Sequence, residues 1–179
     1  PPHYNGFKVS KRNAKPVGEQ TGLADVRKFA AMADRNQIGE GVGGRVEERD
    51  LWAAYTKHVQ KFCDLGGKKL KVVDDASNEL AGTMCPQVFG PKGKFIDGLT
   101  ITELNYDNTK NEFAHEPNPL VASNLAQLQE AVKKHRADLG VCYDGDADRC
   151  VIVDEKAQIV GCDHLPAALT PHFLAQAPG

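Results

Sequence analysis

The stretch LGVCYDGDADRCVIVD, residues 139–154, constrains the fold more than any other part of the sequence. Two apolar runs of strand length, residues 139–143 and 150–154, enclose a short acidic segment. The segment carries three aspartates at alternate positions and then an arginine: Asp144, Asp146, Asp148 and Arg149. Short apolar runs of this kind are typical of buried strands. We therefore expect the acids on a loop between two core strands, at a strand's carboxyl end, where α/β proteins usually carry their chemistry.

Other segments alternate between strand and helix patterns. Residues 68–75 and 99–104 are rich in β-forming side chains and predict two further strands. Residues 123–135 predict a helix with Ser123 as N-cap and basic residues in its last turn. Its inward face is expected to hold Leu125, Leu128 and Val132. This alternation predicts a three-layer α/β/α fold with a mostly parallel mixed sheet.

Two more helices are expected before the first strand. Residues 21–35 repeat apolar side chains at helical spacing, and residues 48–62 place an aromatic and aliphatic stripe on one face. The stripe consists of Trp52, Tyr55, Val59 and Phe62, and we interpret it as core packing. Four glycines in residues 38–45 predict a linker between these helices, with a domain boundary near Gly41.

Composition excludes several classes of function. Lys and Arg number 22 against 24 Asp and Glu, so a net charge of −2 gives no general attraction to nucleic acid or to anionic membranes. No apolar run is long enough to span a bilayer, and the first residues lack a signal-peptide pattern. The five cysteines form no C-x-x-C pair and are odd in number, which favours reduced thiols and a cytoplasmic location.

Three carboxylates that converge repel one another, so a bound cation is their natural partner. Oxygen donors select a hard ion such as Mg²⁺, Mn²⁺ or Ca²⁺. An EF-hand is excluded because Arg149 stands where its loop needs glycine and because strands flank the loop. Arg149 beside a metal site indicates a phosphorylated substrate. A solvated acidic loop remains the plainer alternative.

The acidic motif and four other stretches together resemble the α-D-phosphohexomutase superfamily, which contains the phosphoglucomutases and phosphomannomutases. The other stretches are YNGFK (4–8), VVDDASN (72–78), HEPNPL (115–120) and GCD (161–163). The resemblance implies a piece of a four-domain enzyme, centred on its second, metal-loop domain. Residues 1–40 would end the first domain, 41–160 would form the second, and 161–179 would begin the third.

The resemblance also implies roles for single residues. The three aspartates of the loop would hold Mg²⁺, Arg149 would contact a phosphate, and Lys8 would transfer a proton. Members of the superfamily interconvert hexose 1-phosphate and hexose 6-phosphate through a phosphoserine and a bisphosphorylated intermediate. Their reactive serine lies in a Ser-His-Asn-Pro loop, and this sequence starts at the prolines. The chain alone is therefore expected to be inactive. Glu79 replaces a glycine usual in the superfamily, which affects the turn predicted there.

Two other functions remain open from the sequence. One is a metal-binding or interaction module without catalysis. The other is a phosphatase with an aspartate nucleophile, which the position of Arg149 disfavours because such enzymes usually carry D-x-D-x-T. Under the mutase hypothesis the partners are a phosphorylated hexose, glucose or mannose, and the remaining domains of the same protein, with no nucleic acid and no membrane.

Overall fold

The computed structural model describes residues 7–39, 43–110 and 112–177. The chain divides into two compact units, residues 1–49 and residues 50–179. The boundary predicted near Gly41 falls outside the described residues. The division of the chain at residues 40 and 160 stays a prediction.

The first unit contains a short hairpin and one helix. Strands β1 (Ser10–Lys11) and β2 (Lys15–Pro16) pair antiparallel, and helix α1 (Leu23–Asp34) confirms the helix expected there. None of the described residues of this unit is buried. The unit therefore shows no hydrophobic core within its described part.

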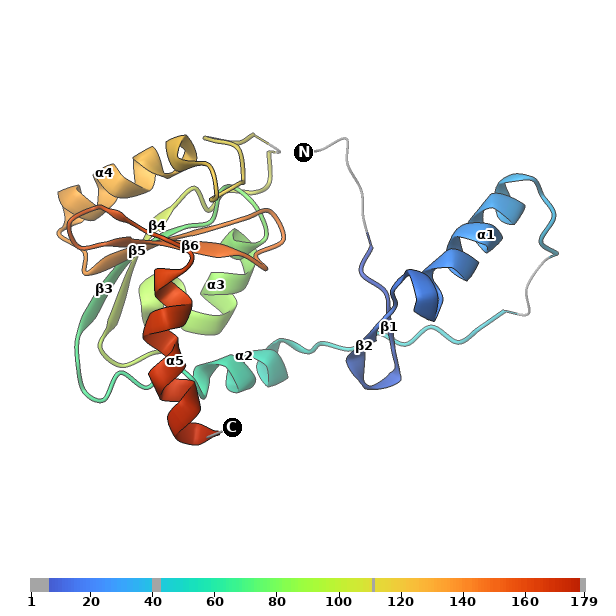
Figure 1. The fold of residues 1–179 in the computed structure, drawn as a ribbon, viewed down its shortest axis with the longest axis horizontal. Helices are drawn as coiled ribbons and strands as arrows, with labels where there is room; N and C mark the ends of the chain where they lie inside the picture. The colour runs from blue at the N-terminus through green and yellow to red at the C-terminus, as the bar shows by residue number, and fades with distance from the viewer. Residues whose placement is uncertain (1–6, 40–42, 111, 178–179) are drawn as a thin grey trace. The chain divides into compact units, whose positions relative to one another are not determined.

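The second unit is built on a five-stranded mixed sheet (Figure 1). The strands are β3 (Leu70–Asp75), β4 (Leu99–Leu104), β5 (Leu139–Tyr143), β6 (Cys150–Asp154) and β7 (Ile159–Val160). Their order is β4-β3-β5-β6-β7, with β3 parallel to both its neighbours and β6 antiparallel to both of its own. The three strands predicted at residues 99–104, 139–143 and 150–154 are confirmed.

Helices cover both faces of this sheet. Helix α4 (Ala126–His135) buries Leu128 and Val132 against β3, β5 and β6. Helix α3 (Ala81–Phe89) lies on the opposite face, where its buried residues pack against Tyr143 of β5 (Figure 1). Successive strand residues point to opposite faces, so β5 serves both layers. The predicted three-layer α/β/α fold is confirmed.

The position of helix α3 against the sheet depends on Gly82, which has no side chain. A Cβ atom at Gly82 would collide with the backbone carbonyl of Tyr106, just after β4. Glycine therefore allows the first turn of α3 to approach the end of the sheet closely. This contact brings the start of α3 to the edge where the strands carry their polar residues.

Two details of the predicted helices are wrong. Helix α2 (Trp52–Gln60) forms, but it packs mainly against α3 and not against the sheet, so Trp52 and Tyr55 remain exposed, as does Phe62 just after the helix. Ser123 is not the N-cap of α4, since a 3₁₀ turn (Ala122–Leu125) precedes the helix and no side chain caps it.

The chain ends in helix α5 (His164–Gln176), which has no buried residue. Among the described residues, no helix combines the length and the apolar character needed to cross a membrane.

Candidate functional site

The aspartate loop joins β5 to β6, which pair antiparallel as neighbours in the sheet. Asp144 donates its N–H to the Arg149 carbonyl at 3.2 Å, and Ala147 donates its N–H to the Asp144 carbonyl at 3.2 Å. The bend requires a left-handed residue, and Ala147 supplies it with φ 58°. Alanine adopts this conformation at a cost of about 1 kcal/mol. The loop thus stores strain at the position between its last two aspartates.

The loop brings together the three carboxylates that the sequence predicted as metal ligands. Asp144, Asp146 and Asp148 each place one oxygen so that all three lie within 4.8 Å of one another. Asp144 is buried, and the other two are exposed. Oxygen donors from a buried and two accessible carboxylates suit a hard divalent ion that keeps several waters, as Mg²⁺ does. The residues present therefore fit such an ion.

Arg149 neutralises the buried member of the trio. Its Nε and Nη2 atoms donate to Oδ2 of Asp144 at 2.8 and 2.7 Å, and its backbone N–H donates to Oδ1 at 3.0 Å. Nε also lies 3.7 Å from Oδ1 of Asp148. The Arg149 side chain is 55% exposed, so one end remains accessible to an anion from solvent. Arg149, which the sequence analysis linked to phosphate, is thus held at the aspartate loop by Asp144.

Glu79 adds a further acid beside this loop. The turn after β3 places Ser77 and Asn78 in the left-handed region with φ 53° and 55°, whereas Glu79 is not left-handed. The glycine usual at position 79 in the superfamily is therefore not required by this backbone. The Glu79 carboxyl group lies 3.8 Å from the position that a Cβ of Gly145 would take, so it adds negative charge near the three aspartates.

Lys8, the predicted proton-transfer residue, is exposed and lies in the first unit. The aspartate loop lies in the second unit, so the role of Lys8 stays a prediction. The preceding residues of YNGFK up to Gly6 lie outside the described residues.

A buried polar network adjoins the aspartate loop on the α4 side of the sheet. Asp75, at the end of β3, is fully buried, and its Oδ2 lies 3.0 Å from Nε2 of His115. The hydrogen bond to Asp75 raises the pKa of His115 above its ordinary value, although partial burial opposes it. In the sequence, His115 stands out only as part of HEPNPL, because no spacing pattern links it to a residue 40 positions earlier.

The other face of β3 carries a second buried acid. Asp74 faces a cavity of about 250 Å³ with largely apolar walls beneath α3. Burial raises the pKa of Asp74 to about 7. The effect of burial is larger than that of the nearby Tyr106 hydroxyl and Cys85 thiol, which lower this pKa. Its Oδ1 atom has no hydrogen-bond partner among the described residues. Burial therefore keeps about half of the Asp74 carboxyl groups protonated at pH 7, where an ordinary aspartate is fully ionised.

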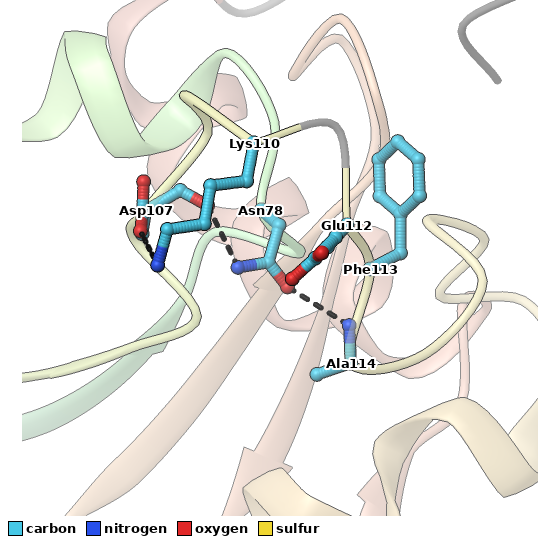
Figure 2. Close-up of a pocket in the computed structure, with 6 residues that line it drawn as sticks. All are labelled: Asn78, Asp107, Lys110, Glu112, Phe113 and Ala114. Carbon is cyan, nitrogen blue, oxygen red and sulfur yellow. Dashed lines mark hydrogen bonds and ion pairs between the residues drawn. The ribbon is translucent and has the colours of Figure 1, made fainter.

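A polar hollow of about 320 Å³ lies beside the loop that follows β4 (Figure 2). Asn78 organises it, since its amide donates to the Asp107 carbonyl at 2.9 Å and its Oδ1 accepts from Ala114 N–H at 3.0 Å. Lys110 reaches Asp107 at 3.3 Å across the rim. Hydrogen bonds from Thr109 and the contact with Lys110 lower the pKa of Asp107 to about 2, so this acid is ionised. The sequence does not indicate this hollow, because its walls combine Asn78, after β3, with the loop that follows β4, about 30 residues later.

Comparison with known proteins identifies the family. Residues 53–158 match the family model described as phosphoglucomutase/phosphomannomutase, alpha/beta/alpha domain II. This match spans more than half of the chain and contains every strand of the five-stranded sheet except β7, which begins at Ile159. The chain belongs to the phosphoglucomutase/phosphomannomutase family. The predicted membership and the centring on the second domain are thus confirmed.

Individual relatives agree with this assignment. A phosphomannomutase of Escherichia coli is 31% identical over 183 residues, covering 100% of this chain and 40% of the relative. A phosphoglucosamine mutase of Clostridioides difficile is 33% identical over 171 residues, covering 92% of this chain and 36% of the relative. A crystal structure of a phosphoglucomutase/phosphomannomutase family protein from Burkholderia thailandensis superimposes with a TM-score of 0.71 at 25% identity, covering 87% of this chain and 32% of that one. The chain thus spans about 40% of the length of the curated relatives it matches.

Proposed function

We propose that the protein to which this chain belongs is a Mg²⁺-dependent phosphohexomutase acting on glucose or mannose phosphates. It interconverts hexose 1-phosphate and hexose 6-phosphate through a phosphoserine and a bisphosphorylated intermediate. The observation that carries the proposal is the convergence of three carboxylates within 4.8 Å beside Arg149, in a chain of this family. Its location is the cytoplasm, in keeping with the free cysteines among the described residues.

The residues of the aspartate loop have two different roles in the proposed reaction. Asp144, Asp146 and Asp148 hold the ion, which supplies positive charge beside a phosphoryl group. Arg149 is held in place by Asp144 and presents the accessible part of its guanidinium to a phosphate oxygen. Phosphoryl transfer depends mainly on such positioning and charge stabilisation, because little covalent chemistry is left for the protein to do. Lys8 accepts or returns the proton of the sugar hydroxyl.

The 179-residue chain alone is expected to bind Mg²⁺ weakly and to have no mutase activity. Mg²⁺ with few carboxylate ligands normally depends on phosphate oxygens as well. The phosphoserine and the sugar-binding segments belong to other parts of the proposed enzyme. Partners are accordingly the phosphorylated hexose and the remaining domains of the same protein.

The test uses the intact protein and a coupled assay that follows glucose 6-phosphate or mannose 6-phosphate formed from the corresponding 1-phosphate. Asp146→Asn should lower kcat by about 10²–10³, the usual effect of losing an electrostatic stabiliser. Glu155→Gln is the matched control, because Glu155 is an exposed acid on the turn after β6. Equal rates for the two variants would refute the metal-loop role. Intact protein that binds Mg²⁺ but converts neither sugar phosphate would support a non-catalytic module.

A further inference from the structure

Three side chains with different donor atoms meet at the carboxyl ends of β3 and β5. Asp75, His115 and Cys142 each place one donor so that the carboxylate oxygen, the imidazole nitrogen and the sulfur lie within 4.8 Å of one another. Asp75 and Cys142 are fully buried, and the His115 side chain is 9% exposed. The three come from separate segments of the chain, so only the tertiary fold brings them together.

The remaining polar atoms of these side chains already have partners. Oδ1 of Asp75 accepts the Ser77 N–H and the Asn105 amide, both at 3.0 Å. Nδ1 of His115 lies 2.9 Å from the Glu116 carbonyl. A carbonyl oxygen only accepts, so Nδ1 must carry a hydrogen. Ligands of protein metal sites are commonly oriented in this way, by hydrogen bonds to the atoms that do not bind the metal.

This arrangement turns two acceptors toward each other. With its hydrogen on Nδ1, the neutral imidazole of His115 presents the lone pair of Nε2 to Oδ2 of Asp75, 3.0 Å away. Two lone pairs in a buried place repel unless a cation lies between them. A proton can fill this place and so can a metal ion. The thiol of Cys142 beside them favours the metal, because sulfur is a poor partner for a proton shared by oxygen and nitrogen but a strong ligand for a soft ion.

We propose that Asp75, His115 and Cys142 form a second metal site, distinct from the aspartate trio, which takes one Zn²⁺-type transition-metal ion. A mixed oxygen, nitrogen and sulfur set selects Zn²⁺ and its analogues, whereas the all-carboxylate trio selects Mg²⁺. Tetrahedral bonds of about 2.0–2.3 Å place the ligand atoms roughly 3.3–3.6 Å apart. The 3.0 Å separation of Asp75 from His115 therefore needs to open by only a few tenths of an ångström. Water completes the coordination at the slightly exposed edge of His115.

Such an ion would join β3 to β5 directly below the aspartate loop. Asp75 pairs with Cys142 in the parallel ladder between these strands, and Cys142 precedes Asp144 by two residues. The sulfur of Cys142 and the carboxylate of Asp75 are shielded from solvent at this site. Its existence is independent of the mutase reaction.

Cobalt is the probe, because Co²⁺ bound to a thiolate gives a near-ultraviolet charge-transfer band. When the metal-free 179-residue chain is titrated with CoCl₂, the intensity of this band should rise until one equivalent of Co²⁺ has been added. A stoichiometric amount of ZnCl₂ should then remove the band. A large excess of MgCl₂ should leave it unchanged. Cys142→Ser should abolish the band. Two controls should retain it: Cys150→Ser, which removes an exposed thiol, and Asp146→Asn, which disrupts the trio. A band that survives in Cys142→Ser would overturn the proposal.

A second measurement needs no variant and covers the case in which Cys142→Ser fails to fold. X-ray absorption at the zinc edge of the wild-type chain with one equivalent of Zn²⁺ should show one sulfur at about 2.3 Å and oxygen or nitrogen neighbours at about 2.0–2.2 Å. A shell of oxygen and nitrogen alone would overturn the proposal. In that case only a proton joins Asp75 to His115.

Discussion

Asp74 offers a direct test of how burial controls charge in this fold. Its carboxyl group lies in an apolar cavity, with Oδ1 unpartnered among the described residues and a pKa raised by burial from 3.8 to about 7. Asp74→Asn keeps the shape of the protonated acid but cannot ionise. We therefore expect the variant to be more stable than the wild type at neutral and alkaline pH.

The magnitude and sign follow from the pKa shift. A pKa that is higher in the folded state means that folding retains the proton, so stability falls as pH rises from about 4 toward 7 and then levels off. A shift of about 3 units, at 1.36 kcal/mol per unit, gives about 4 kcal/mol in total. Most of this loss, about 2.5 kcal/mol, should occur between pH 5 and pH 8. Water entering the cavity would reduce the figure, so it is an upper value.

The assay is urea unfolding followed by circular dichroism at several pH values. The difference in free energy of unfolding between Asp74→Asn and wild type should grow in favour of the variant by up to about 2.5 kcal/mol from pH 5 to pH 8. Glu155→Gln, which removes an exposed acid, should follow the wild-type curve at every pH. Parallel curves for Asp74→Asn and wild type would show that Asp74 ionises normally, and the reasoning from burial would be refuted.

Three further outcomes can be measured. His115→Ala should lower the free energy of unfolding by about 3–5 kcal/mol, because it leaves a buried carboxylate without its partner, whereas His164→Ala, at an exposed position, should have little effect in the same urea titration. Ala147→Gly should raise the free energy of unfolding by about 0.5–1 kcal/mol by relieving the left-handed alanine, and a lower urea midpoint would contradict this. Lys8→Ala in the intact protein should lower kcat by about 10²–10⁴ and remove one limb of the pH–rate profile while Mg²⁺ affinity stays unchanged; a loss below threefold with the limb retained would exclude proton transfer by Lys8.

The sequence predicted the strands well because their burial is strong and local. β4, β5 and β6 begin and end where the apolar runs do, and the aspartate loop lies between β5 and β6 as expected. β7 was not predicted, since a strand of two residues has no period to detect. Helix α3 was also missed, because Gly82 and Pro86 are both residues that usually interrupt helices. Its stability comes from packing against Tyr106 and Tyr143.

What the sequence could not predict depends on contacts between distant residues. The exposure of Trp52 shows that helical spacing identifies an apolar face but not the surface that covers it. The pairing of Asp75 with His115 joins the end of β3 to a loop residue 40 positions later. The hydrogen bond from Arg149 to Asp144 joins residues close in sequence. It nevertheless depends on a bend in which Ala147 adopts a left-handed conformation that alanine disfavours.

The antiparallel pairing of β5 with β6 gives the aspartate loop a fixed length. Tyr143 pairs with Cys150 across its base, and Val151 and Val153 of β6 are buried in the core beneath α4. Because side chains alternate along a strand, one residue added to or removed from the loop would either force a bulge or slide β6 by one position and turn both valines away from that core. Substitutions in the loop change only the carboxylates that it presents, whereas a change in its length disturbs the packing of the whole domain.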